Sequence, residues 1–86
     1  MIKISSRIKV RTNQNDTILI FDPDRDFFHE FNGTASEMFL LLKEGKSKEE
    51  IIKILTDKYE VEIKMVEKEF ESFIKKLIKL GVAEKI

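Results

Sequence analysis

The stretch FFHEFNGTA, residues 27–35, marks the point at which the periodicity of the chain changes. Up to Phe31 the apolar residues follow the pattern of extended strands, whereas from Thr34 onward they recur at helical spacing. This change predicts strands in the first part of the chain and helices in the second. The expected fold class is therefore α+β.

Three strands are expected before this point, in residues 6–11, 17–21 and 27–31. The second is a dense apolar run rich in β-branched residues, which is typical of a central strand buried on both faces. The polar turns between them, residues 12–16 and 22–26, are short. The strands are therefore expected to form a three-stranded antiparallel sheet with the third strand at an edge.

Three helices are expected after it, in residues 34–42, 47–59 and 66–80. The first two begin with capping-box patterns, at Thr34 and at Ser47, in which a glutamate follows three residues later. Gly45 and Gly81 stand where the first and third helices end. Residues 82–86 form a short apolar tail that can pack back as a strand.

Composition excludes several classes of function. A chain of 86 residues is long enough for one domain, which we expect to span residues 1–86. Sixteen Lys and Arg balance sixteen Asp and Glu, whereas a nucleic-acid-binding protein usually carries a basic excess. No apolar run approaches the length of a membrane span, and no signal-peptide pattern follows Met1, so we expect a cytoplasmic protein.

No pattern in the chain predicts an active site. Cysteine is absent and His29 is the only histidine, which excludes thiol chemistry and a zinc site made of such ligands. The aspartates of residues 22–26 have the spacing that opens an EF-hand loop, but Phe27 and Gly33 stand where that loop requires Gly and Glu. We therefore expect a turn there, no cofactor, no metal and no enzymatic activity.

The third strand carries an unusual concentration of aromatic residues. Phe27, His29 and Phe31 share one of its faces. Phe28 and Glu30 share the other, so Phe28 is exposed if the first face lies on the core. An uncovered apolar edge strand invites the addition of another strand. The alternative is that Phe28 packs under the first helix or the tail.

The third helix has an apolar stripe wider than one buried face needs. Ile63, Ile74 and Ile78 lie together on one flank of the stripe. The opposite flank carries Met65, Glu69 and Lys76. A widened apolar stripe beside an exposed strand predicts a groove whose wall and floor they form. The alternative is that the wide stripe reflects ordinary core packing of a long helix.

Several segments in order resemble the PqqD family: FNGTA at 31–35, KEGKS at 43–47, EI at 50–51, KYEV at 58–61 and FIKKLIKLGV at 73–82. The resemblance extends over about residues 6–86. Two positions depart from the family pattern. Phe31 replaces a usual leucine, and Lys43-Glu44-Gly45 replaces a common Asp-Gly.

The resemblance implies a winged-helix-like fold and the function of a RiPP recognition element. Such modules are non-catalytic chaperones that hold the leader of a ribosomally made precursor peptide. They present it to a modifying enzyme, often a radical SAM protein, in the biosynthesis of pyrroloquinoline quinone (PQQ) or another modified peptide. The leader adds as an antiparallel strand to the third strand and lies against the third helix.

The resemblance also implies which residues bind the peptide. Carried over by position, the peptide-binding residues are Phe27, Phe28, His29, Glu30 and Phe31 on the strand, and Phe70, Ile74 and Ile78 on the helix. Because the chain has no net charge, electrostatic attraction of a leader must be local. Candidate contacts of this kind are Lys75, Lys76 and Lys79.

Two alternatives stay open at this point. The helical half could serve as the helix-turn-helix of a winged-helix DNA-binding or regulatory protein. Recognition helices usually contact bases from their N-terminal part, where this third helix is acidic and would repel phosphate. The residues concerned are Glu62, Glu67, Glu69 and Glu71. Formation of a homodimer through the exposed edge strand also stays open.

Overall fold

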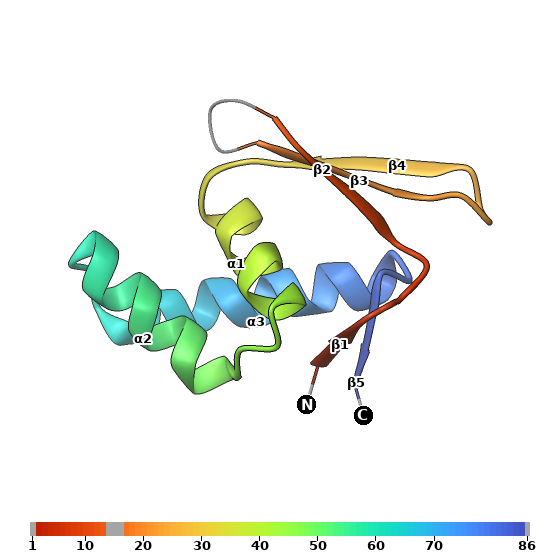
Figure 1. Cartoon of the computed structure of the whole chain (residues 1–86). Coiled ribbons are helices and arrows are strands. Elements are labelled where there is room, and N and C mark those ends of the chain that lie inside the picture. The colour runs from red at the N-terminus through yellow and green to blue at the C-terminus, as the bar shows by residue number, and fades with distance from the viewer. Residues whose placement is uncertain (1, 14–16, 86) are drawn as a thin grey trace.

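The computed structural model describes residues 2–13 and 17–85 (Figure 1). Its strands are β1 (Ile2–Ile4), β2 (Lys9–Thr12), β3 (Ile18–Asp22), β4 (Phe27–Phe31) and β5 (Ala83–Lys85). Its helices are α1 (Gly33–Lys43), α2 (Lys48–Tyr59) and α3 (Ile63–Lys79). Of the turn expected at residues 12–16, residues 14–16 lie outside the described part, as does the last residue of the expected tail, Ile86.

Strands β2, β3 and β4 form an antiparallel sheet in that order. The register between β3 and β4 places Ile18 opposite Phe31 and Ile20 opposite His29. Figure 1 shows this sheet lying across the helices, which follow it in the chain. The predicted fold class, a three-stranded antiparallel sheet followed by three helices, is confirmed.

Only one face of this sheet is covered. Along β3, Ile18 and Ile20 are buried, whereas Leu19 and Phe21, which alternate with them, are partly exposed. The prediction that this strand is buried on both faces is therefore wrong. An antiparallel meander needs no crossover helix, so the helices pack on one face and leave the other to solvent.

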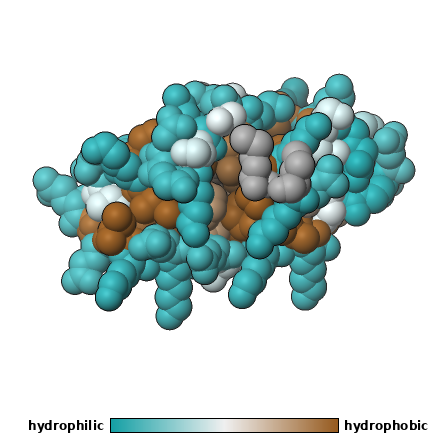
Figure 2. All heavy atoms as spheres, turned by 90° about the horizontal axis from the view of Figure 1, so that it is seen from below, coloured by the Kyte–Doolittle hydropathy of each residue, from teal (hydrophilic) through white to brown (hydrophobic). Residues whose placement is uncertain are grey.

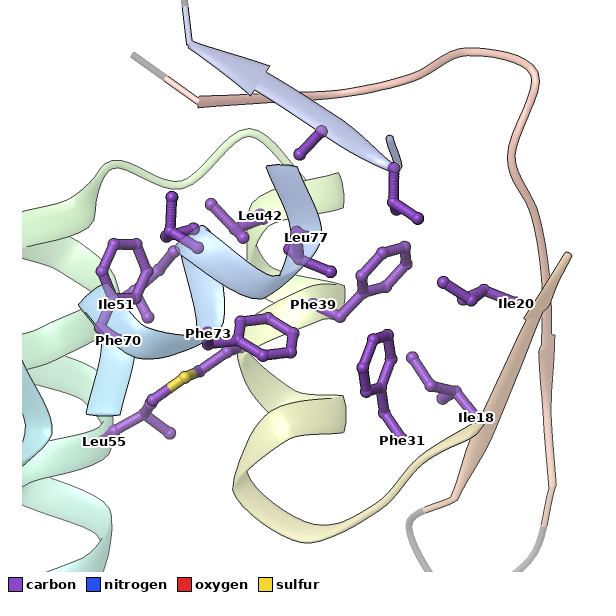
Figure 3. Packing of buried hydrophobic residues seen from close by; sticks show 14 of the residues in the cluster. Ile18, Ile20, Phe31, Phe39, Leu42, Ile51, Leu55, Phe70, Phe73 and Leu77 are labelled. Atoms are coloured by element: carbon purple, nitrogen blue, oxygen red, sulfur yellow. The ribbon is translucent and has the colours of Figure 1, made fainter. Parts of the chain in front are cut away.

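The core joins the covered face of the sheet to α1 and α3. The centre of the Phe31 ring lies 5.2 Å from the centre of the Phe73 ring, in an edge-on arrangement, and 5.9 Å from the centre of the Phe39 ring (Figure 3). Ile20 and Leu77 are completely buried in the same cluster. The end of β4 is thereby fixed on α3.

A second, smaller sheet joins the two ends of the described chain. Strand β5 pairs antiparallel with β1, with Ala83 opposite Ile4. The prediction that the tail packs back as a strand is confirmed, but its partner β1 was not expected. Val82, directly before β5, is completely buried.

Helix α2 begins as predicted and α1 does not. The hydroxyl of Ser47 accepts a hydrogen bond from the Glu50 amide, and the Glu50 carboxylate accepts one from the Ser47 amide, which completes a capping box. The capping box predicted at Thr34 is wrong, because α1 already begins at Gly33. The carboxylate of Glu37 instead accepts hydrogen bonds from side chains of α2.

The turn after β3 contains an ion cluster in which two exposed arginines surround a buried carboxylate. Asp22 has no exposed surface, and its Oδ2 lies 2.7 Å from Nε of Arg7 and 2.9 Å from Nε of Arg25. The two guanidinium groups also donate to the carbonyl oxygens of Gly81, at 3.3 Å, and of Leu80, at 2.7 Å. The predicted turn is confirmed, and its first aspartate attaches the sheet to the C-terminal end of α3.

Candidate functional site

The outer edge of β4 is unpaired. In the sheet order β2-β3-β4, this strand has β3 on one side and no further strand among the described residues on the other. The prediction that the third strand is an edge is confirmed. In such a strand about every second residue directs its N–H and C=O groups away from its neighbour. These groups offer main-chain hydrogen bonds to another extended chain.

The two faces of β4 differ as its alternation requires. Phe31 is 4% exposed and faces the helices, with Phe27 and His29 half-buried on the same face. Phe28 is 63% exposed on the other face and stacks on Phe21 of β3 at 5.7 Å. The alternative in which Phe28 packs under a helix or the tail is therefore wrong.

The inner face of β4 is a row of aromatic rings. The ring of His29 lies 6.2 Å from Phe27 and 4.7 Å from Phe31. The ammonium group of Lys76 on α3 stands 5.7 Å from the centre of the Phe31 ring. Burial, and then the nearby charge of Lys76, lower the pKa of His29. The imidazole is therefore favoured in its neutral form, which can accept as well as donate a hydrogen bond.

A hollow of about 540 Å³ continues from the C-terminal end of β4, between α1 and α3. We call it the sheet-side groove. It is lined by Asn32, Gly33, Thr34, Ala35, Met38, Lys68, Glu69, Ser72 and Phe73. The edge of β4, the ring of Phe73 and the charge of Lys76 are thus close together on one side of α3.

The predicted helical residues lie elsewhere. Phe70, Ile74 and Ile78 line a second hollow, of about 980 Å³, between α3, β1 and the α1–α2 connection. The prediction that they form the wall beside the third strand is wrong in its geometry. Phe73 packs on Phe31, and this contact turns the flank of α3 that carries Lys76 toward β4.

The three predicted lysines also separate. Lys76 lies beside β4, whereas Lys75 lines the second hollow. Lys79 lines neither of the two hollows. Ser72 and Ala35 line the sheet-side groove but were not among the predicted site residues. The sequence offered a signal for Ser72, which shares a flank of α3 with Glu69 and Lys76, opposite the isoleucines.

The described residues contain neither a metal site nor a membrane-spanning helix. Among residues 2–13 and 17–85, no group of three or more His, Asp or Glu side chains is placed to hold a metal ion. None of the helices described is long and apolar enough to cross a membrane.

The family model described as coenzyme PQQ synthesis protein D (PqqD) matches residues 17–83, which run from β3 to the start of β5. The chain belongs to the PqqD family. No curated protein sequence matches this PqqD-family chain.

Solved structures share the fold of this PqqD-family protein over nearly its whole length. One is TbiB1 in complex with the TbiA(beta) leader peptide, with a TM-score of 0.91, 24% identity, and coverage of 98% of this chain and 96% of that chain. Another is lasso peptide synthetase B1 complexed with the leader peptide, with a TM-score of 0.87, 23% identity, and coverage of 98% of both chains.

Proposed function

We propose that this PqqD-family protein is a non-catalytic chaperone that binds the leader of a ribosomally made precursor peptide at the edge of β4. The observation that carries the proposal is the unpaired edge of β4 beside the sheet-side groove. Main-chain hydrogen bonds supply affinity and alternate side chains supply specificity in this mode of binding. Membership of the PqqD family and the leader complexes of two structural neighbours support it.

The direction of the added strand fixes where the peptide ends lie. A leader antiparallel to β4 has its N-terminal end beside Phe31, where the sheet-side groove begins. An apolar side chain there enters the groove between Ala35 and Phe73. Successive side chains then alternate between the helix-facing side, with His29 and Lys76, and the solvent side, with Phe28.

The bound leader holds the rest of the precursor for a modifying enzyme. We propose a radical SAM enzyme as that partner and PQQ or another modified peptide as the product. The winged-helix DNA-binding alternative gains no support from the family or from the two neighbours. The N-terminal half of α3 carries Glu67, Glu69 and Glu71, which would repel a phosphate backbone.

The test is a titration of ¹⁵N-labelled protein with the precursor peptide encoded beside its gene. We expect the amide signals of residues 27–31, Ser72 and Phe73 to move. Unchanged signals in residues 27–31 would contradict strand addition. The same shifts on addition of mixed-sequence duplex DNA, weakened by salt, would favour the DNA-binding alternative instead.

Two adjacent lysines provide a matched pair of variants. Lys76→Glu reverses the charge beside Phe31 and should weaken binding of the precursor by about tenfold, which corresponds to about 1.4 kcal/mol. Lys75→Glu makes the same change in net charge on the other flank of α3 and should leave the affinity unchanged. Equal losses in both variants would show that the peptide responds to net charge and not to this site.

A further inference from the structure

The second hollow is strongly basic although the whole chain is neutral. We call it the lysine-rimmed groove. Six lysines line it against two glutamates, Glu49 and Glu71. The lysines are Lys3, Lys43, Lys46, Lys48, Lys75 and Lys85. The sheet-side groove, in contrast, has one residue of each sign, Lys68 and Glu69. Positive charge is therefore concentrated on one surface of the molecule.

Most of these lysines have no acidic partner within the described chain. Lys48 pairs with Glu71 at 3.3 Å. In residues 2–13 and 17–85, the other five lysines form none of the ion pairs found within 4.0 Å. The charge of Lys46 also acts on Glu50, where it contributes to the lowered pKa of that carboxyl. The charges of the other four are available to an external ligand, and an anionic ligand would relieve the mutual repulsion of the lysines.

The floor of the lysine-rimmed groove is apolar. Phe70, Ile74 and Ile78 follow one another at intervals of four residues along α3, with Ile2 and Ile4 of β1 also lining the groove. Phe70 and Ile74 are buried, whereas Ile78 is 38% exposed, so this end of the floor is open to a ligand. Figure 2 shows a band of hydrophobic side chains between hydrophilic ones on the side of the molecule that carries β1 and β5.

We infer that the lysine-rimmed groove is a docking site for an acidic amphipathic segment of a partner protein, separate from the peptide edge at β4. Apolar side chains of the segment contact Ile78 and the partly exposed Ile2 and Ile4. Its carboxylates face Lys43, Lys46 and Lys75. Lysine stems extend along apolar surface while their ammonium groups stay at the rim, so both kinds of contact form together. A phosphate backbone alone would leave the apolar floor uncovered, which favours a protein ligand.

The two sites can be occupied at the same time. Lys75 lines this groove and Lys76 lies beside β4, and successive residues of a helix are rotated by about 100°. A ligand in one groove therefore leaves the other open. The inference goes beyond the proposed function, because it needs no precursor peptide to be bound.

The test uses a fluorescein-labelled synthetic peptide with glutamates on one face and leucines at helical spacing on the other. Fluorescence anisotropy measures its affinity for the whole protein without precursor peptide, and ¹⁵N spectra locate it. We expect shifts at Lys43, Lys46, Ile74 and Ile78, and unchanged signals in residues 27–31. Because no precursor is present, failure here and failure of leader binding are separate results.

Variants decide whether the groove itself binds. Lys46→Glu, Lys75→Glu and Ile78→Asp should each weaken binding by about tenfold. Lys53→Glu changes the net charge equally on α2, where the lysine side chain is 80% exposed and lines neither groove. This control should bind as the parent protein does.

Four results would overturn the inference. They are an equal loss in Lys53→Glu, equal binding of a peptide with serine in place of leucine, shifts centred on residues 27–31, and displacement of the acidic peptide by duplex DNA. The first two would reduce the interaction to net charge. The third would assign the acidic peptide to the β4 edge, and the fourth would identify the groove as a nucleic-acid site.

Discussion

Asp22 is the residue on which the attachment of sheet to helix depends. Its carboxylate accepts hydrogen bonds from Arg7 and Arg25, whose guanidinium groups also bind carbonyl oxygens at the end of α3. Positive charge is favourable at a helix C-terminus because the helix dipole is negative there. At Gly81, φ is +75° and a Cβ atom would lie 2.6 Å from a guanidinium nitrogen of Arg25, so any other residue would be strained and would displace this group.

This cluster predicts a specific acid sensitivity. Burial opposes ionisation of Asp22, but hydrogen bonds from Arg7 and Arg25 outweigh it and lower the pKa to about 2, from 3.8. A carboxyl whose pKa is lowered by folding stabilises the folded state at pH values above its pKa in the unfolded chain. This stabilisation is lost as the pH falls from about 4 to about 2. Asp22→Asn should remove this dependence and lower Tm at pH 7 by about 5 °C or more.

Thermal unfolding followed by circular dichroism at several pH values measures both effects. Asp26→Asn is the matched control, because Asp26 is exposed in the same turn and asparagine tolerates its positive φ of 51°. The control should have the same Tm at pH 7 as the parent protein and the same loss of stability between pH 4 and pH 2. A parent protein whose stability does not change between pH 4 and pH 2 would contradict the role of Asp22.

His29 makes a second prediction at this scale. Its pKa lies below 6.5, first because the ring is partly buried and second because of the charge of Lys76. The folded state therefore loses stability as the pH falls from 6.5 through the lowered pKa of His29. Lys76→Gln should raise the pKa of His29 while leaving it below 6.5, since burial remains. Lys75→Gln should not change it. NMR titration is direct because the chain has one histidine, and a pKa above 6.5 in the parent protein would refute this account.

Strand β4 has one structural face and one exposed face, and the two should respond differently to truncation. Phe31→Ala should lower the free energy of unfolding by about 3–5 kcal/mol, because the ring packs on Phe39 and Phe73 in the core. Phe28→Ala should cost about 1 kcal/mol or less, because its main contact is the exposed stack on Phe21.

Urea denaturation measures both changes. Phe31→Leu keeps most of the buried volume and should cost less than Phe31→Ala, so the comparison survives even where the alanine variant does not fold. A loss for Phe28→Ala of about 3 kcal/mol, as expected for truncation of a buried ring, would show that the outer face of β4 is covered in solution.

The order of the elements was predictable because each has a strong local pattern. The aromatic alternation of β4, the capping box at Ser47 and the stripe of α3 depend only on neighbouring residues. The rotation of α3 about its axis does not, because it follows from the packing of Phe73 on Phe31, residues 42 positions apart. The isoleucine flank was therefore assigned to the wrong neighbour, although the edge strand was correct.

Two other features were beyond local patterns. Strand β1 is three residues long, and only its pairing with β5 at the other end of the chain makes it a strand. Asp22 reads as an ordinary turn residue, because Arg7 lies 15 positions before it. Both depend on contacts between distant segments, to which neither propensity nor periodicity responds.

For the molecule as a whole, the junction of β1 with β5 closes the fold. Val82 is completely buried, its amide donates to the Leu77 carbonyl at 2.9 Å, and its carbonyl accepts from the Ser5 amide at 2.8 Å. Val82→Ala should lower the free energy of unfolding by about 2 kcal/mol through two lost methyl groups and the remaining cavity. Lys85→Ala, at an exposed position of β5, should have little effect.

Hydrogen exchange provides an independent measurement of the same junction. In Val82→Ala the amides of β1 should exchange faster relative to those of β3, because local opening separates the ends while the main sheet stays paired. Equal acceleration in both strands would mean that the two sheets open as one cooperative unit.

Helix α3 lies between the sheet-side groove and the lysine-rimmed groove, so its thickness sets the spacing of the two proposed binding surfaces. An α-helix with its side chains is about 10–12 Å across, so chains lying on its two flanks are separated by little more than that distance. An extended tether of about four residues spans such a gap. When a partner protein holds the same precursor peptide that is bound at β4, its docking segment has a high effective concentration at the lysine-rimmed groove. Weak contacts at each surface would then suffice for tight binding of the partner and the peptide together.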